Sequence, residues 1–189
     1  MKHAASREFF AYWDTQRGRE RAPQRSMIAP ERLRHLLGDV FVLGGDVRGY
    51  PVRVAGTRIC ALFGHDIKGE NFVNLVEPES RANLRALIDV VAYEMLPTVA
   101  GLSAATEDGL ELRHELLLLP FAPQPYTPAS LTGLLACLHD RGGPLHDFML
   151  RSWRHIHPSR AGGLRLIRRL KLPHGLTVYE DTAGQHAAR

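Results

Sequence analysis

Hydrophobic residues recur at helical spacing in two parts of the chain. Near its start, Phe9, Phe10 and Trp13 form an apolar stripe that predicts a helix. Ser6 stands just before this stripe and is of a type that caps helices. Further on, a run that opens at Pro78 has a 3.6-residue apolar period and predicts a long amphipathic helix, with the stripe Leu84, Leu87, Ile88, Val91 and Met95.

Short apolar runs, the first two of them rich in valine, predict strands elsewhere. The turn signals Gly44-Gly45-Asp46 and Asp108-Gly109 separate neighbouring runs, as hairpin loops do. Strict alternation in the second run puts Val52 and Val54 on one face of the strand and Arg53 on the other. Two strands, short helices, one long helix and three strands in this order predict a single antiparallel sheet of the α+β class. The predicted strands are residues 39–43, 50–55, 98–104, 110–119 and 131–138.

The chain divides into three sections. We expect an N-terminal helical cap over residues 1–38, a sheet domain over 39–139 and a partly ordered C-terminal extension over 140–189. The whole chain has 24 Lys and Arg against 20 Asp and Glu, and the excess lies in the extension, whose net charge is +5 against −1 for residues 1–139. In the extension, residues 146–157 can form a short amphipathic helix and residues 176–179 a strand.

Glycine-marked turns flank a short helical run between Tyr50 and Val76. This segment closely resembles the PAS_5 family of small stand-alone PAS proteins, through Tyr50, Arg53, Ala55-Gly56-Thr57, Phe63-Gly64, Ile67, Gly69 and Phe72. The lead-in resembles it too, through Tyr12-Trp13, Arg17, Gly18, Pro23, Arg25, Pro30 and Leu33. The extension lies outside the resemblance.

The resemblance implies a fold and a role. The fold is a PAS-like antiparallel five-stranded sheet with short helices and one long helix on one face, preceded by a helical cap. The role is that of a sensory or adaptor module in intracellular signalling, without a catalytic output domain. Such a module acts by binding a small ligand, by docking a signalling protein, or both.

The resemblance also places a ligand-cradling space between the sheet and the short helices. Arg53 is the candidate anchor, because its planar fork can hold a carboxylate or a phosphate. The alternative is a solvated strand face, or an ion pair with Glu111 or Glu115. The candidate pocket residues are Arg53, Thr57, Phe72, Tyr93 and His114, and for Phe72 a place in a filled core is the alternative.

Cofactor chemistry finds little support in the sequence. Light-sensing PAS domains of the LOV type carry a cysteine after a Gly-x-Asn turn, but Phe72 takes that position here, which argues against a covalent flavin adduct. Haem-binding PAS domains generally take their axial histidine from the long helix, and residues 78–95 contain none. No nucleophile elbow, phosphate loop or metal-ligand spacing occurs, so we expect neither an enzyme nor a metal site.

Cellular location and partners follow from weaker signals. Cys60 and Cys137 are far apart and predict a reducing compartment, and no run is apolar enough for a membrane span or export signal, so we expect a cytoplasmic protein. The stripe of Phe9, Phe10 and Trp13 either packs on the chain's own sheet or forms part of a homodimer interface.

The basic residues of the extension suggest a second function. The candidate anion-binding cluster is Arg165, Arg168, Arg169 and Lys171. This cluster supports an alternative in which a PAS-dimerised regulator binds nucleic acid. A solvated or protein-docked basic helix is the other interpretation.

Overall fold

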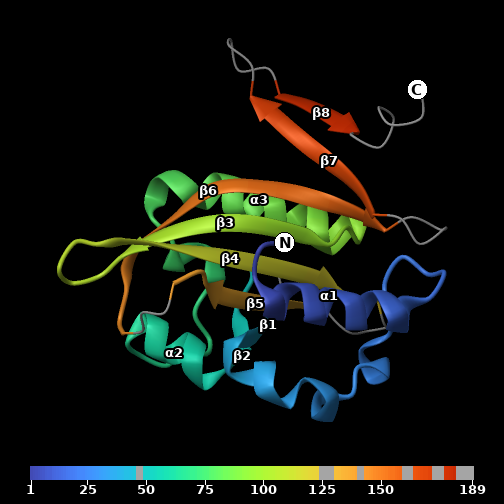
Figure 1. The fold of residues 1–189 in the computed structure, drawn as a ribbon, viewed down its shortest axis with the longest axis horizontal. Helices are drawn as coiled ribbons and strands as arrows, with labels where there is room; N and C mark the ends of the chain where they lie inside the picture. The colour runs from blue at the N-terminus through green and yellow to red at the C-terminus, as the bar shows by residue number, and fades with distance from the viewer. Residues whose placement is uncertain (46–48, 124–129, 140–142, 159–163, 172–176, 182–189) are drawn as a thin grey trace.

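The computed structural model describes the backbone of residues 1–45, 49–123, 130–139, 143–158, 164–171 and 177–181, and side chains as far as His157. One antiparallel sheet forms its centre, with the strand order β2-β1-β5-β4-β3-β6-β7-β8 (Figure 1). The strands are β1 (Val40–Gly44), β2 (Val52–Ala55), β3 (Thr98–Ala105), β4 (Glu111–Pro120), β5 (Ser130–Cys137), β6 (His146–Pro158), β7 (Leu164–Lys171) and β8 (Thr177–Asp181).

The first five strands lie within two residues of their predicted ends, but the prediction of a five-stranded sheet is wrong. The C-terminal extension adds three strands, because β6 pairs with the edge of β3 and is followed outward by β7 and β8. Residues 146–157 are therefore a strand and not the predicted helix. The edge of β3 presents backbone N–H and C=O groups that need hydrogen-bond partners. Pairing with these groups favours a strand over the weakly amphipathic helix.

Helices cover both faces of the sheet. On the inner face lie α2 (Thr57–Phe63), the 3-10 helix η3 (Phe72–Leu75) and α3 (Pro78–Glu94). On the outer face lies α1 (Ala4–Arg17), followed by the 3-10 helices η1 (Arg25–Met27) and η2 (Pro30–Asp39). Figure 1 shows α1 and α3 on opposite sides of the central strands. The cap and the long helix thus occupy different faces.

The start of α1 differs from the expectation. The helix begins at Ala4, and its cap is His3, whose ring Nδ1 accepts a hydrogen bond from the backbone N–H of Ala5 at 3.2 Å. Ser6 lies inside the first turn and is fully buried. The N-terminus is fixed by Glu115 of β4, whose carboxylate accepts the backbone N–H groups of Lys2 and His3 at 2.5 and 3.0 Å.

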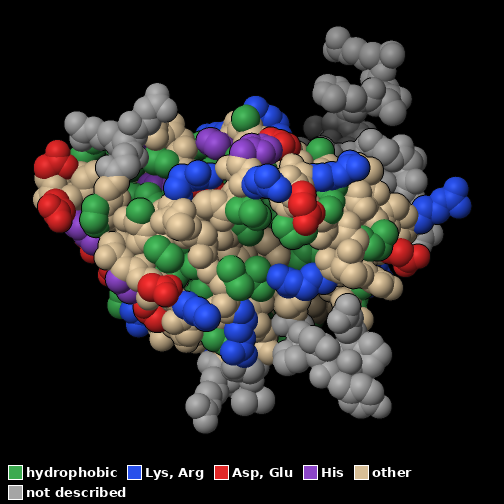
Figure 2. All heavy atoms as spheres, turned by 90° about the horizontal axis from the view of Figure 1, so that it is seen from below, with side chains coloured by type: hydrophobic (Ala, Val, Ile, Leu, Met, Phe, Trp, Pro, Cys, Tyr) green, Lys and Arg blue, Asp and Glu red, His purple; other side chains and the backbone are tan. Residues whose placement is uncertain are grey.

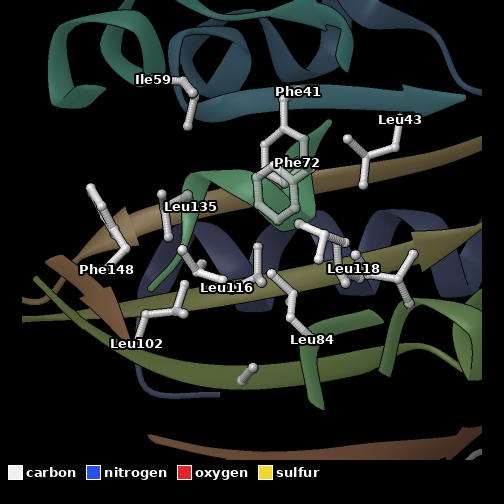
Figure 3. Packing of buried hydrophobic residues seen from close by; sticks show 14 of the residues in the cluster. Phe41, Leu43, Ile59, Phe72, Leu84, Leu102, Leu116, Leu118, Leu135 and Phe148 are labelled. Atoms are coloured by element: carbon white, nitrogen blue, oxygen red, sulfur yellow. The ribbon is translucent and has the colours of Figure 1, made fainter. Parts of the chain in front are cut away.

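Alternation along β4 divides the core into two layers. Leu112, Leu116 and Leu118 face the inner helices, whereas Leu117 and Leu119 face α1. In the inner layer, the Phe41 and Phe72 rings stack with 4.5 Å between their centroids (Figure 3). The stripe predicted for α3 is confirmed for Leu84, Leu87, Ile88 and Val91, which are all buried in this layer. Its fifth residue, Met95, is the C-cap just after the helix and packs against the outer layer instead.

Strand β2 departs from simple alternation at Arg53. Val42 pairs with Val54 but Leu43 pairs with Val52, so the register shifts by one residue and Arg53 is the extra residue of a bulge. Val52 is consequently buried in the inner layer, whereas Val54 is 57% exposed. The prediction that Val52 and Val54 share a face is therefore wrong.

Candidate functional site

The cradle, as we call the space between the inner face of the sheet and α2, η3 and α3, is the place where the resemblance puts a ligand. Side chains of the chain itself fill it. Three come from segments far apart in sequence: Phe41 of β1, Phe72 of η3 and Phe148 of β6 (Figure 3). The interpretation of Phe72 as a core residue is the one that its 3% exposure supports.

The five predicted pocket residues do not come together. Phe72 and His114 lie in the cradle and are buried. Thr57 is exposed at the start of α2 and lines a separate groove on the outer face. Tyr93, near the end of α3, is 75% exposed. The structure therefore does not bring the predicted set together as a single ligand shell.

Arg53 is exposed and does not enter the cradle. Its side chain lies over Gly44, where a Cβ would stand 2.6 Å from the Arg53 Nε. The predicted ion pairs are also wrong, because β1 and β5 separate β2 from β4. Of the two acids proposed, Glu111 pairs with Arg151 of β6 at 3.1 Å and Glu115 holds the start of α1.

His114 is the unusual polar group of the cradle. It faces the inner layer from β4, is 1% exposed, and neither of its ring nitrogens has a hydrogen-bond partner in the described part of the chain. Burial lowers its pKa, and the nearby backbone of Leu112 opposes this shift in part. The imidazole is therefore neutral at pH 7, with an unpaired donor and an unpaired acceptor in an apolar space.

Phe148 of the C-terminal extension closes the cradle beside His114. Its ring centroid is 4.6 Å from that of Phe63 on α2 and 5.9 Å from that of His114. Leu145, just before β6, is buried in the same cluster. Sequence analysis missed both residues. The sequence showed that both residues are apolar and follow the break at Gly142-Gly143-Pro144. This pattern did not indicate that they pack in the cradle.

Other candidate groups are accounted for individually. Cys60 and Cys137 are free thiols, both half-buried, and the Cys60 Sγ is 3.9 Å from Asp66 Oδ1. Over the residues that the structure describes, no group of three or more His, Cys, Asp and Glu gathers to hold a metal ion. In the same part of the chain, no helix is both long and apolar enough to cross a membrane.

The predicted anion-binding cluster lies on β7 rather than on a helix, and its side chains are outside the description.

The Phe9, Phe10 and Trp13 stripe packs on the chain's own sheet. These side chains are 2%, 4% and 0% exposed, and the Trp13 indole N–H donates to the Pro120 carbonyl at 2.8 Å. They thus present little exposed surface in the single chain, which supports the alternative that the stripe packs on the chain's own sheet. A homodimer stays a prediction, to be tested by light scattering.

Comparison with known proteins agrees with this architecture. A family model described as a PAS domain, PAS_5, matches residues 1–136. Among solved structures, a fungal LOV-domain photoreceptor is similar at 18% sequence identity and a TM-score of 0.42, over 52% of this chain and 73% of that one. No curated protein matches. The family model covers well over half of the chain, including the cap, the helices α2 and α3 and the strands from β1 to all but the last residue of β5, so this chain belongs to the PAS_5 family of PAS domains.

Proposed function

We propose that this chain is a sensory or adaptor module in signalling that works by binding a small ligand in the cradle and passing the event to its C-terminal extension. The observation that carries the proposal is the contact between Phe148 of the extension and buried His114, whose ring nitrogens have no hydrogen-bond partner among the described residues. Partners then dock on surfaces that depend on the position of the extension.

His114 supplies a reason for a ligand to bind. A buried polar group without a partner costs about 1–3 kcal/mol relative to a satisfied one. A ligand with a hydroxyl or a carbonyl group next to a compact apolar body satisfies one ring nitrogen and replaces the Phe148 ring. The gain from this hydrogen bond offsets part of the cost of moving Phe148.

The extension is placed to report such a change, because it is bonded to both helices that roof the cradle. The Leu145 N–H donates to the Leu62 carbonyl of α2 at 2.7 Å. The Phe148 carbonyl accepts the N–H of Glu77, at the start of α3, and the Leu150 N–H donates to Ser80 Oγ, both at 2.9 Å. A ligand that displaces Phe148 therefore strains these contacts and loosens the beginning of β6.

Phenol and toluene test the site, since they have similar shapes and differ in hydrogen bonding. In a Phe148→Ala variant, which opens a ring-sized space, phenol should bind about 3- to 10-fold tighter than toluene. His114→Leu in the same background should remove that preference. In the wild type, phenol has to displace Phe148, so it should bind more weakly than it binds to Phe148→Ala. Its binding should also speed hydrogen exchange at the Leu145 and Leu150 amides.

Two results would overturn the proposal. One is binding of phenol to the wild type with no change of exchange in β6, since the extension would then not respond to the cradle. The other is a Phe148→Ala variant that is folded but binds neither probe. Native mass spectrometry of freshly purified wild type complements the test, because a retained molecule identifies the class of the ligand.

A further inference from the structure

A groove on the outer face, which we call the cap groove, lies between the N-terminal cap and the β1–β2 edge of the sheet. Its volume is about 520 Å³, within the range of sites that bind small molecules. Figure 2 shows the molecule from below, where hydrophobic side chains are interspersed with basic ones on the surface. The walls of the groove include Phe9, Leu33, Val42, Val54 and Phe121.

The local sequence holds the groove open. Val42 faces the groove from β1. Val54 faces the groove from β2, because the bulge at Arg53 turns its side chain away from the inner core. Gly56 allows the cap to approach the end of β2 closely, because a Cβ at this position would stand only 2.2 Å from the Leu37 carbonyl oxygen. The cap is thus docked by backbone contact at one end of the groove and by the apolar side chains of α1 at the other.

Arg25 is the charged residue of the cap groove. Its guanidinium carbon lies 5.3 Å from the centroid of the Phe121 ring, and Nη1 donates to Ser130 Oγ at 3.0 Å. The apolar surroundings partly desolvate it and lower its pKa. No carboxylate in the described ranges pairs with it, whereas Arg17, Arg58 and Arg151 have acid partners at 2.6, 2.6 and 3.1 Å.

We propose that the cap groove binds a small organic acid with an apolar body, whose carboxylate is held by Arg25. The planar guanidinium fork matches a carboxylate, and Ser130 takes only one of its N–H groups. The apolar part of the ligand lies along the groove walls. A single guanidinium balances a single negative charge, so one carboxylate matches Arg25 better than a doubly charged phosphate monoester.

This site is separate from the cradle, which lies on the other face of the sheet, so the two proposals can fail independently. The test compares octanoate, 1-octanol and octylamine by calorimetry on the wild-type chain. A charge-assisted hydrogen bond predicts that octanoate binds about 10-fold or more tightly than octanol, and octylamine more weakly than either. Equal affinity for octanoate and octanol would overturn the proposal.

Variants locate the effect. Arg25→Gln should remove the preference for octanoate, and Arg25→Lys should keep part of it, because the charge remains but the fork is lost. Arg32→Gln, at an exposed position of η2 outside the groove lining, is the matched control and should bind octanoate as the wild type does. Val42→Phe fills the groove and should weaken all three probes. Octanoate binding that Val42→Phe or Arg25→Gln leaves unchanged, in folded protein, would place the anion elsewhere and overturn the proposal.

Discussion

Phe148 of β6 stacks on Phe63 of α2, with 4.6 Å between the ring centroids and 30° between the ring planes. These residues are far apart in the chain, and their contact joins the C-terminal extension to the helix that closes the cradle. The beginning of the extension is therefore part of the core, since Leu145 and Phe148 are buried in the same cluster as Phe41 and Phe72.

Removal of this ring should destabilise the whole protein. Phe148→Ala deletes a side chain that is 3% exposed and leaves a cavity, so the free energy of unfolding should fall by about 3–5 kcal/mol. Urea denaturation followed by far-UV circular dichroism measures the loss. Tyr93→Ala is the control, because this ring is 75% exposed and its loss should cost less than about 0.5 kcal/mol. Equal losses in the two variants would show that Phe148 is not a core residue.

His114 should make the protein less stable as the pH falls. Burial lowers the pKa of the folded state, so below the unfolded value of about 6.5 the unfolded chain binds more protons. Stability is therefore full above this value and declines until the pH reaches the folded pKa. His114→Leu should flatten the decline in urea midpoints measured between pH 7 and pH 5.

A second histidine gives the matching control for this pH dependence. His65 is exposed, and its hydrogen bond to Glu70 raises its pKa, so its contribution has the opposite sign. His65→Gln should keep the decline on the acid side. A decline that persists unchanged in His114→Leu would assign it to other groups.

The part of the fold that sequence patterns predicted is the part with strong periodicity. The helix from Pro78 is confirmed because its apolar residues recur at helical spacing from Leu84 to Val91, and β3, β4 and β5 are confirmed because their apolar runs are bounded by turn signals. Local sequence carried enough information for these elements, since each buries one face or both against the same core.

The predictions that were wrong share a physical cause: each depended on contacts between segments that are far apart in the sequence. The apolar residues Phe148, Met149 and Trp153 suggested an amphipathic helix over residues 146–157, but this segment pairs with the open edge of β3 as strand β6. The bulge at Arg53 depends on the register with β1, which alternation within β2 does not contain. The site prediction failed for the same reason, since family position alone put Arg53 and Tyr93 near the cradle.

Glu115 should stabilise the attachment of α1 in a pH-dependent way. Burial alone would raise its pKa, but hydrogen bonds, above all the one from the backbone N–H of Lys2, together outweigh this effect and hold the pKa below its usual value. The stabilisation is therefore present above the unfolded pKa of about 4.3 and is lost as the pH falls through the folded value.

Glu115→Gln tests this attachment. The amide keeps one acceptor oxygen and loses the charge, so the variant should be about 1–3 kcal/mol less stable at pH 7 and less sensitive to acid than the wild type. Glu8→Gln is the control, since Glu8 lies on the exposed side of α1 and pairs with His35 at 3.0 Å. An acid response of Glu115→Gln equal to that of the wild type would remove Glu115 as its source.

Gly133 of β5 should be irreplaceable as long as Phe41 keeps its ring. A Cβ at this position would stand 2.1 Å from Phe41 Cζ, so Gly133→Ala forces the ring away from Phe72 and should cost about 3 kcal/mol. Gly101→Ala on β3 is the matched control, because its Cβ would meet only Ser152 Oγ at 3.0 Å. The double variant Gly133→Ala with Phe41→Leu should be more stable than the sum of the two single losses allows, by about 1 kcal/mol or more in a double-mutant cycle of urea unfolding. Strict additivity would mean that the methyl group and the ring do not compete for the same space.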